Sequence, residues 1–252
     1  MKQLIFSFAT AAVLLLGACG KPGDSAGVPE SLRTFVQNAN GQQAMDTLVT
    51  LLRENAGPAP ELATLLAMVM EGKMQDTLAA LSVYQAIVQA YPDNKFGKTA
   101  SERIPKGTPA LDERIEAMQS KMFDPLKMMA DPAVVGTYLH SCMARVLLLP
   151  KDAKSASMLN KAAENAYYTQ QYPKSLYLYE WLEAAYPDDD KAAQALFMRA
   201  FIYDNDLKQY DLAKPLYELF LQKYPKDDFA DDAQVLLKNL GKSPEEMIQE
   251  LQ

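Results

Sequence analysis

Three stretches of the chain carry hydrophobic residues every three or four positions, and each stretch ends in Tyr-Pro. They cover residues 77–94, 172–190 and 210–228, and in each a further tyrosine lies seven positions before the Tyr-Pro tyrosine. A three-and-four spacing places apolar side chains on one face of a helix. The proline interrupts the helix, and the Asp residues that follow are favoured N-caps. Each stretch therefore predicts the end of one helix and the start of another.

A second helical pattern lies directly in front of each stretch, so the chain is predicted to form hairpins of two helices. These first helices are expected within residues 61–72, 156–170 and 191–205. The last two Tyr-Pro pairs begin at residues 186 and 224, which are 38 positions apart. A period of this size built from helix pairs is typical of an α-solenoid. We therefore predict an all-α fold, an α-solenoid of helical hairpins.

The rest of the N-terminal half also favours helices, but without a regular repeat. Residues 111–129 place apolar side chains on one helical face, and the Asp-Pro pairs at 124–125 and 131–132 each predict an N-cap followed by a proline at the first helical position. Residues 31–55 predict one or two further helices. No segment alternates clearly enough to be a strand, so this half is expected to be irregular and helical.

The first residues of the chain follow the pattern of a secretory signal. Lys2 precedes a short apolar run over residues 4–16, which is shorter than the roughly 20 residues that span a membrane. The sequence Leu-Gly-Ala-Cys at 16–19 resembles the bacterial lipoprotein processing box, which implies removal of residues 1–18 and acylation of Cys19. The alternative is an ordinary secreted protein with a cysteine near its cleavage site. Residues 19–30, rich in Gly, Pro and small polar types, predict a flexible tether.

Composition and charge exclude several classes of function. The formal net charge is −7, which disfavours sequence-independent nucleic-acid binding, because such binding relies on Lys and Arg. A hydrophobic fraction of 49% argues against general disorder. With Cys19 acylated, Cys142 has no partner, so no disulfide framework is expected, and Cys142 is interpreted as a small buried apolar residue.

The sequence offers little for enzymatic chemistry. The single histidine, His140, lies two residues from Cys142, a spacing that puts the two on different helical faces and suits neither a metal site nor a nucleophile and base pair. No Gly-rich phosphate loop, HExxH or GxSxG is present. We predict no catalytic residues, no metal site, no cofactor and no small-molecule substrate.

The hairpins resemble the tetratricopeptide repeat in their small and aromatic residues. An aromatic residue follows four positions after a small residue of the second helix, and proline ends each unit. The small residues at close-packing positions are Ala67, Ala162 and Ala200 in first helices, and Ala80 and Ala213 in second helices. The resemblance implies a divergent unit at 61–94 within a helical region at 31–150, two units within 151–240, and a helical cap at 241–252.

The tetratricopeptide resemblance also implies a binding groove. Most of the thirteen tyrosines lie between residues 167 and 224. Positions on the first helices of such an array tend to face its concave side, and exposed aromatic residues there serve protein recognition. The candidate groove residues are Tyr167, Phe197, Phe201 and Asp204. Packing within the repeats remains the alternative use of these aromatic residues.

A basic segment stands out in the acidic chain. Residues 95–107 carry four basic residues and one glutamate, and are interpreted as a loop. The loop is either simply solvated or contacts an acidic patch of a partner or lipid headgroups. Its candidate partner-binding residues are Lys95, Lys98, Arg103 and Lys106.

The processing box together with Tyr-Pro repeats is similar to the tetratricopeptide lipoproteins of the bacterial outer membrane, above all the β-barrel assembly lipoprotein family. The neutral Gly20 after the acylated cysteine implies outer-membrane delivery, with the protein facing the periplasm. The resemblance implies a non-enzymatic scaffold that binds protein partners. The alternative is an accessory lipoprotein of cell-envelope, peptidoglycan or polysaccharide processing or of cell-division coordination. A purely structural envelope protein is a third interpretation.

Overall fold

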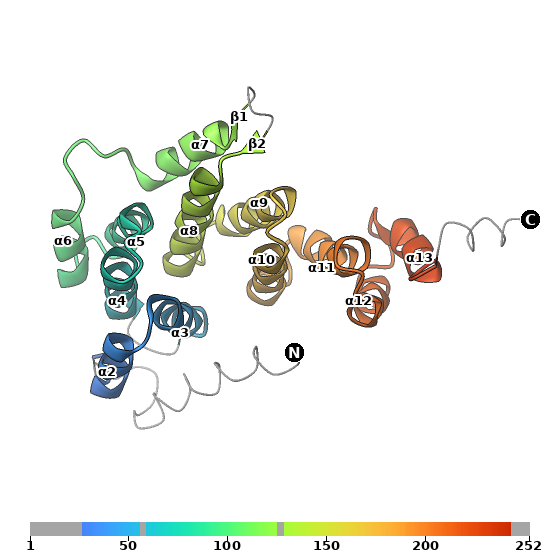
Figure 1. Ribbon diagram of the computed structural model, residues 1–252, viewed down its shortest axis with the longest axis horizontal. Helices are drawn as coiled ribbons and strands as arrows, with labels where there is room; N and C mark the ends of the chain where they lie inside the picture. The colour runs from blue at the N-terminus through green and yellow to red at the C-terminus, as the bar shows by residue number, and fades with distance from the viewer. Residues whose placement is uncertain (1–26, 56–58, 125–128, 243–252) are drawn as a thin grey trace, which may run out of the picture. The chain divides into compact units, whose positions relative to one another are not determined.

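The computed structural model describes residues 27–55, 59–124 and 129–242 (Figure 1). The predicted signal, Cys19, most of the tether and residues 243–252 of the predicted cap lie outside the described residues. The described part of the chain forms twelve α-helices and one π-helical segment. The predicted all-α fold built from successive helical hairpins is therefore confirmed. None of the described helices has the length and apolar character needed to cross a membrane.

The chain divides into two compact units, the first ending at Ser155 and the second starting at Ala156. The described residues of unit 1 form seven helices and a pair of two-residue strands. The helices are α2 (Glu30–Asn38), α3 (Gly41–Arg53), α4 (Ala59–Gly72), α5 (Thr77–Ala90), α6 (Lys95–Glu102), α7 (Leu111–Lys121) and α8 (Pro132–Leu148). The strands β1 (Phe123–Asp124) and β2 (Met129–Ala130) pair in antiparallel register. This short ladder is an exception to the expectation that no strand would form.

The core of unit 1 forms where α4, α5 and α8 meet. Helix α5 packs against both α4 and α8, and α3 packs against α4. The predicted small residues Ala67 and Ala80 are buried, which lets α4 and α5 approach closely. Helix α8 begins as the Asp-Pro signal predicts, because Asp131 accepts the backbone N–H of Ala133 at 2.9 Å.

Unit 2 is a row of hairpins, in which each helix packs on the next. Its helices are α9 (Ser155–Tyr168), which begins at the last residue of unit 1, α10 (Tyr172–Ala185), α11 (Lys191–Phe201), continued by the π-helical η1 (Ile202–Asp206), α12 (Tyr210–Lys223) and α13 (Ala230–Lys238). Helices α10, α11 and α12 each contact the following helix. The predicted small residues Ala162, Ala200 and Ala213 are fully buried.

The three Tyr-Pro joints share one geometry. Tyr91, Tyr186 and Tyr224 each follow the last residue of a second helix, with φ near −130° and ψ near 55°. Three residues after each tyrosine, a short polar side chain accepts a backbone N–H two positions further on. These bonds are Phe96 to Asn94 at 3.0 Å, Lys191 to Asp189 at 2.9 Å, and Phe229 to Asp227 at 3.0 Å. Asn94 is the N-cap of α6, whereas the bonds of Asp189 and Asp227 lie in the turns before α11 and α13. The N-cap positions of α11 and α13 are Asp190 and Phe229, and neither makes a side-chain cap bond, so the predicted capping by aspartates is not found at these two joints.

The turns inside the hairpins also share a feature that the hydrophobic pattern does not show. Gln75, Gln170 and Lys208 have positive φ of 56°, 59° and 53°, and each lies in the short turn between the two helices of a hairpin. A left-handed residue ends a helix tightly, although it is usually glycine. The three hairpins therefore close in the same way.

Candidate protein-binding surface

The structure assigns Phe197 to the core of unit 2, which corrects the prediction that it faces a groove. Its side chain is 6% exposed, and its ring lies 4.7 Å from that of Phe229 and 5.6 Å from that of Phe220. The physical reason is its position in the middle of α11, between α12 and the segment leading into α13. Phe197 therefore holds two hairpins together and is not available to a partner.

Phe201 and Asp204 are half-buried and take part in the same packing. The Phe201 ring stacks on Phe197 with centroids 6.3 Å apart. The hydroxyl of Tyr217 donates to Asp204 Oδ2 at 3.4 Å, and burial raises the pKa of Asp204. Both residues retain an accessible side, so a role in binding stays a prediction for them.

Tyr167 lies in an aromatic group beside the turn that joins the two helices of the first hairpin of unit 2. Its ring is 5.6 Å from that of Tyr168, in an edge-to-face arrangement, and 6.0 Å from that of Tyr172. Tyr168 and Tyr172 were not predicted as site residues. The side chain of Tyr168 is 77% exposed, the highest value among the large hydrophobic residues described as exposed. This group thus offers the accessible aromatic surface that Phe197 does not.

Asp206, the last residue of η1, belongs to the same group. Its hydrogen bond with Tyr172 raises the pKa of the Tyr172 hydroxyl, and burial, followed by the charge of Asp206, raises the pKa of Tyr167. The Oδ2 atom of Asp206 is buried and accepts no hydrogen bond from the described residues. We call Tyr167, Tyr168, Tyr172 and Asp206 the tyrosine–aspartate cluster.

A group of polar side chains, Asn160, Glu164 and Gln194, joins the first helices α9 and α11, and we call it the polar seam. The amide of Asn160 donates to Glu164 Oε1 at 2.8 Å and to Gln194 Oε1 at 3.3 Å, and Gln194 donates to the same Glu164 oxygen at 3.2 Å. Asn160 is 5% exposed, and its Oδ1 has no hydrogen-bond partner among the described residues. The seam therefore links α9 to α11 through side-chain amides and leaves the buried Asn160 Oδ1 without a donor from the described residues.

Tyr179 of α10 connects the seam to the tyrosine–aspartate cluster. Burial, then the negative charge of Glu164, raises the pKa of Tyr179, and Tyr167 and Tyr168 contribute as well. The Tyr179 side chain is fully buried, and within the described chain its hydroxyl has no hydrogen-bond partner. An unpaired buried hydroxyl is costly, so this one marks a place where a further polar group would stabilise the protein.

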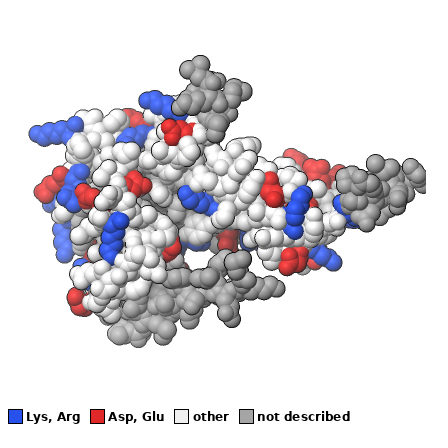
Figure 2. Space-filling view, in the orientation of Figure 1, with Lys and Arg blue, Asp and Glu red and all other residues white. Residues whose placement is uncertain are grey.

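The basic segment of unit 1 is mostly a helix, which corrects its interpretation as a loop. Asn94 caps α6, and the helix approaches the preceding joint so closely that a side chain at Gly97 would lie 1.9 Å from the carbonyl oxygen of Tyr91. Lys95, Lys98 and Lys106 are exposed. On the face of unit 1 shown in Figure 2, basic side chains lie among acidic ones. This surface carries no uniform basic patch.

Arg103, the fourth basic candidate, is occupied within unit 1. Its guanidinium donates to Glu71 Oε2 at 2.7 Å and lies 5.6 Å from the centroid of the Tyr84 ring. The Tyr84 hydroxyl donates to the same Glu71 oxygen at 3.1 Å. Arg103 therefore fastens the end of α6 to α4 and α5, while its side chain remains 51% exposed.

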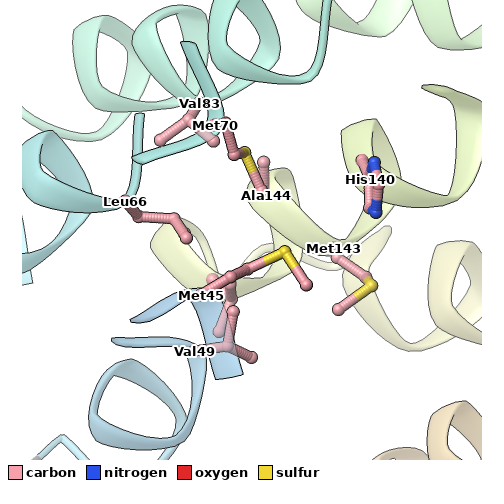
Figure 3. A pocket seen from close by; sticks show the side chains of 9 residues that line it. Met45, Val49, Leu66, Met70, Val83, His140, Met143 and Ala144 are labelled. Atoms are coloured by element: carbon pink, nitrogen blue, oxygen red, sulfur yellow. The ribbon is translucent and has the colours of Figure 1, made fainter. Parts of the chain in front are cut away.

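An apolar pocket lies in unit 1 (Figure 3). Residues from α3, α4, α5 and α8 line it, and three of them are methionines: Met45, Val49, Leu66, Met70, Val83, His140, Met143, Ala144 and Leu147. His140 is the one titratable member, and its Nδ1 lies 3.3 Å from Asp76 Oδ2. Cys142 is fully buried, and burial raises its pKa to about 12. Among the described residues, no three His, Cys, Asp or Glu lie where they would hold a metal ion.

Comparison with known families identifies two of the hairpins. The family model described as the tetratricopeptide repeat matches residues 64–94, which include α5 and most of α4, and residues 194–227, which include α12 and most of α11. The chain contains tetratricopeptide repeats. The hairpin α9–α10, which carries most of the tyrosine–aspartate cluster, lies outside both matches. No curated protein matches the chain. Tetratricopeptide repeats suggest protein partners in general and are commonly non-catalytic.

Proposed function

We propose that the protein is a non-enzymatic scaffold that binds partner proteins through the helical hairpins of unit 2. The observation that carries this proposal is the exposed ring of Tyr168 beside the partly buried carboxylate of Asp206, in the tyrosine–aspartate cluster of a chain with tetratricopeptide repeats. Aromatic residues are enriched at the centres of protein interfaces, where they supply much of the binding energy. The cluster lies at one end of the hairpin α9–α10, on a rigid helical support.

The proposal places the scaffold on the periplasmic face of the outer membrane, anchored by lipid on Cys19. Its support is the sequence Leu-Gly-Ala-Cys at 16–19 behind a short apolar run. Acyl chains on one cysteine hold a protein at a membrane without a spanning helix, because each buried methylene contributes about 0.8 kcal/mol. The similarity of the Tyr-Pro repeats to those of the β-barrel assembly lipoproteins supports a role in outer-membrane protein assembly.

The anchor is tested by metabolic labelling with a clickable fatty acid. We expect the wild-type protein to incorporate the label and to fractionate with membranes, and the variant Cys19→Ser to do neither. The variant Cys142→Ser is the matched control, because it removes the other cysteine and leaves the proposed anchor intact. Labelling that persists in Cys19→Ser would overturn the anchor.

Partner binding is tested by crosslinking in intact cells, followed by purification from membranes and mass spectrometry. We expect components of β-barrel assembly in the crosslinked material. Recovery of enzymes of peptidoglycan or polysaccharide processing, or of division proteins, would replace the assembly role with the alternative. Reproducible absence of any protein partner would overturn the scaffold itself.

A pair of surface variants connects this experiment to the structure. Tyr168→Ala removes an exposed ring from the tyrosine–aspartate cluster, whereas Val235→Ala shortens a residue of α13 that is 58% exposed. We expect the first variant to lose most of the crosslinked partner and the second to retain it. Equal recovery with both variants would show that partners bind elsewhere on the chain.

A further inference from the structure

We infer that the tyrosine–aspartate cluster is a binding site for a cationic side chain, an arginine of a partner protein. The inference rests on the proposed function and adds to it the chemistry of the bound residue. The cluster brings together the last two residues of α9, the first residue of α10 and the last residue of η1. The three tyrosines are close together in the sequence, whereas Asp206 comes from the next hairpin of unit 2.

The carboxylate of Asp206 provides the charge. Its interactions with Tyr167 and Tyr172 leave Oδ2 buried and without a donor among the described residues. The positive charge of Lys208, two residues after Asp206 in the sequence, interacts with the carboxyl group of Asp204. A buried acceptor without a partner costs free energy until a donor reaches it, and a charged donor gives the stronger bond. The site therefore favours a cation over a neutral or anionic group.

The polar seam beside the cluster provides an independent observation. Asn160 is 95% buried with an unpaired Oδ1, and the fully buried Tyr179 has an unpaired hydroxyl, which lies within the electrostatic influence of Glu164, Tyr167 and Tyr168. Apart from the hydroxyl, the unpaired atoms here are acceptors. A guanidinium carries five N–H donors in a fixed plane, so it can supply the donor that Asp206 Oδ2 lacks among the described residues.

The aromatic rings explain why arginine fits better than a small cation. The Tyr168 ring is largely exposed, and the three tyrosine rings of the cluster stand at tilted or edge-to-face angles to one another. A planar guanidinium stacks on such a ring, and this contact adds to the charge pair. A metal ion would require several converging carboxylates, and the described residues bring no such group together.

The test uses the full-length chain with ¹⁵N-labelled tyrosine and nuclear magnetic resonance. The probe is blocked arginine, Nα-acetyl-arginine-N-methylamide, and the control probe is its citrulline analogue, which has the same shape without charge. We expect arginine to shift the amides of Tyr167, Tyr168 and Tyr172 in a saturable way. The amide signals of the three tyrosines of unit 1, Tyr84, Tyr91 and Tyr138, serve as internal references and should not shift.

Two variants separate charge from structure. Asp206→Asn should weaken arginine binding by about tenfold, because it replaces a charge-assisted hydrogen bond by a neutral one. Asp211→Asn, which removes an exposed carboxylate at the start of α12, is the matched control and should bind as the wild type does. Tyr168→Ala should weaken binding several-fold, and Tyr168→Phe should restore it, because the ring and not the hydroxyl stacks on the ligand.

Two results would overturn the inference. One is an equal response to arginine and citrulline, and the other is equal arginine affinity in Asp206→Asn and Asp211→Asn with both variants folded by circular dichroism. Either result leaves the proposed scaffold standing if the crosslinking experiment recovers a partner that Tyr168→Ala loses. Conversely, arginine binding with no recoverable protein partner would preserve the cation site and overturn the scaffold.

Discussion

Arg145 provides a quantitative test of how unit 1 is held together. This residue of α8 is 1% exposed, and it forms two bonds with Asp112 of α7, from Nε at 2.6 Å and from Nη2 at 3.3 Å. Its Nη2 also lies 3.2 Å from Asp152, and its Nη1 donates to Ser155 at 3.5 Å. One buried guanidinium therefore joins α7, α8 and the segment that leads into α9.

The predicted cost of removing this charge follows from the burial of its partners. Arg145→Met keeps much of the aliphatic volume, so the variant mainly removes the guanidinium. Removing one member of a fully buried pair costs about 3–5 kcal/mol. The side chains of Asp112 and Asp152 remain 27% and 38% exposed, so water solvates them in the variant. We therefore expect the free energy of unfolding to fall by about 2–3 kcal/mol.

Urea unfolding followed by far-ultraviolet circular dichroism measures this loss. Lys191→Met is the control, because Lys191 forms an ion pair with the 80% exposed side chain of Asp190 and should lose at most about 1 kcal/mol. Combining Arg145→Met with Asp112→Asn should give less destabilisation than the sum of the two single variants. A loss for Arg145→Met no larger than that for Lys191→Met, or strict additivity in the double variant, would refute the role of the network.

Three further predictions follow from other parts of the structure. Phe197→Ala should lower the free energy of unfolding by about 3–5 kcal/mol, measured by urea unfolding with Trp181 fluorescence, because the ring is buried in unit 2; a small loss would restore its surface role. The hydrogen bond with His140 lowers the pKa of Asp76 in the folded protein. The stability that this carboxylate contributes is therefore present above about pH 4 and should be lost as the pH falls through the lowered pKa of the folded state. In Asp76→Asn, the thermal unfolding temperature should depend less on pH over that acid range. Gln170→Gly should raise the unfolding free energy by about 0.5–1 kcal/mol in the same assay, since glycine adopts the positive φ without strain; a loss of stability would contradict this.

The hairpins were predictable because each depends on residues close together in the sequence. The Tyr-Pro pairs end three second helices, and Asp189 and Asp227 then accept backbone N–H groups in the turns that follow, although they are not the N-cap residues of α11 and α13. The helix α6 was not predicted, because its segment is basic and polar. The one sequence feature that indicated this packing is Gly97, because the absence of a side chain there lets α6 lie against the Tyr91 carbonyl. A glycine inside a polar segment thus marked a close backbone approach.

The candidate site was harder to predict because it depends on which side of a helix the neighbouring hairpin covers. Phe197 and Tyr167 both lie on first helices, yet Phe197 is in the middle of α11 with α12 and Phe229 against it, whereas Tyr167 lies in the last turn of α9. Periodicity places a residue on a face, but it does not say how far the adjacent helix extends along that face. Residues near helix ends remain accessible more often, so Tyr168 was a better candidate than Phe197.

Asp206 differs from the aspartates that follow the Tyr-Pro pairs. The aspartates after Tyr-Pro accept backbone N–H groups at the joints, and this local use explains their acidity without any ligand. Asp206 lies instead at the end of η1, where the extra residue of a π-turn changes the direction of the following side chains and where such turns often accompany functional sites. Its Oδ2 has no donor within the part of the chain that the structure describes. A regular α-helix through residues 202–206 would direct these side chains differently, so the site depends on a local irregularity that neither the repeat period nor the hydrophobic pattern encodes.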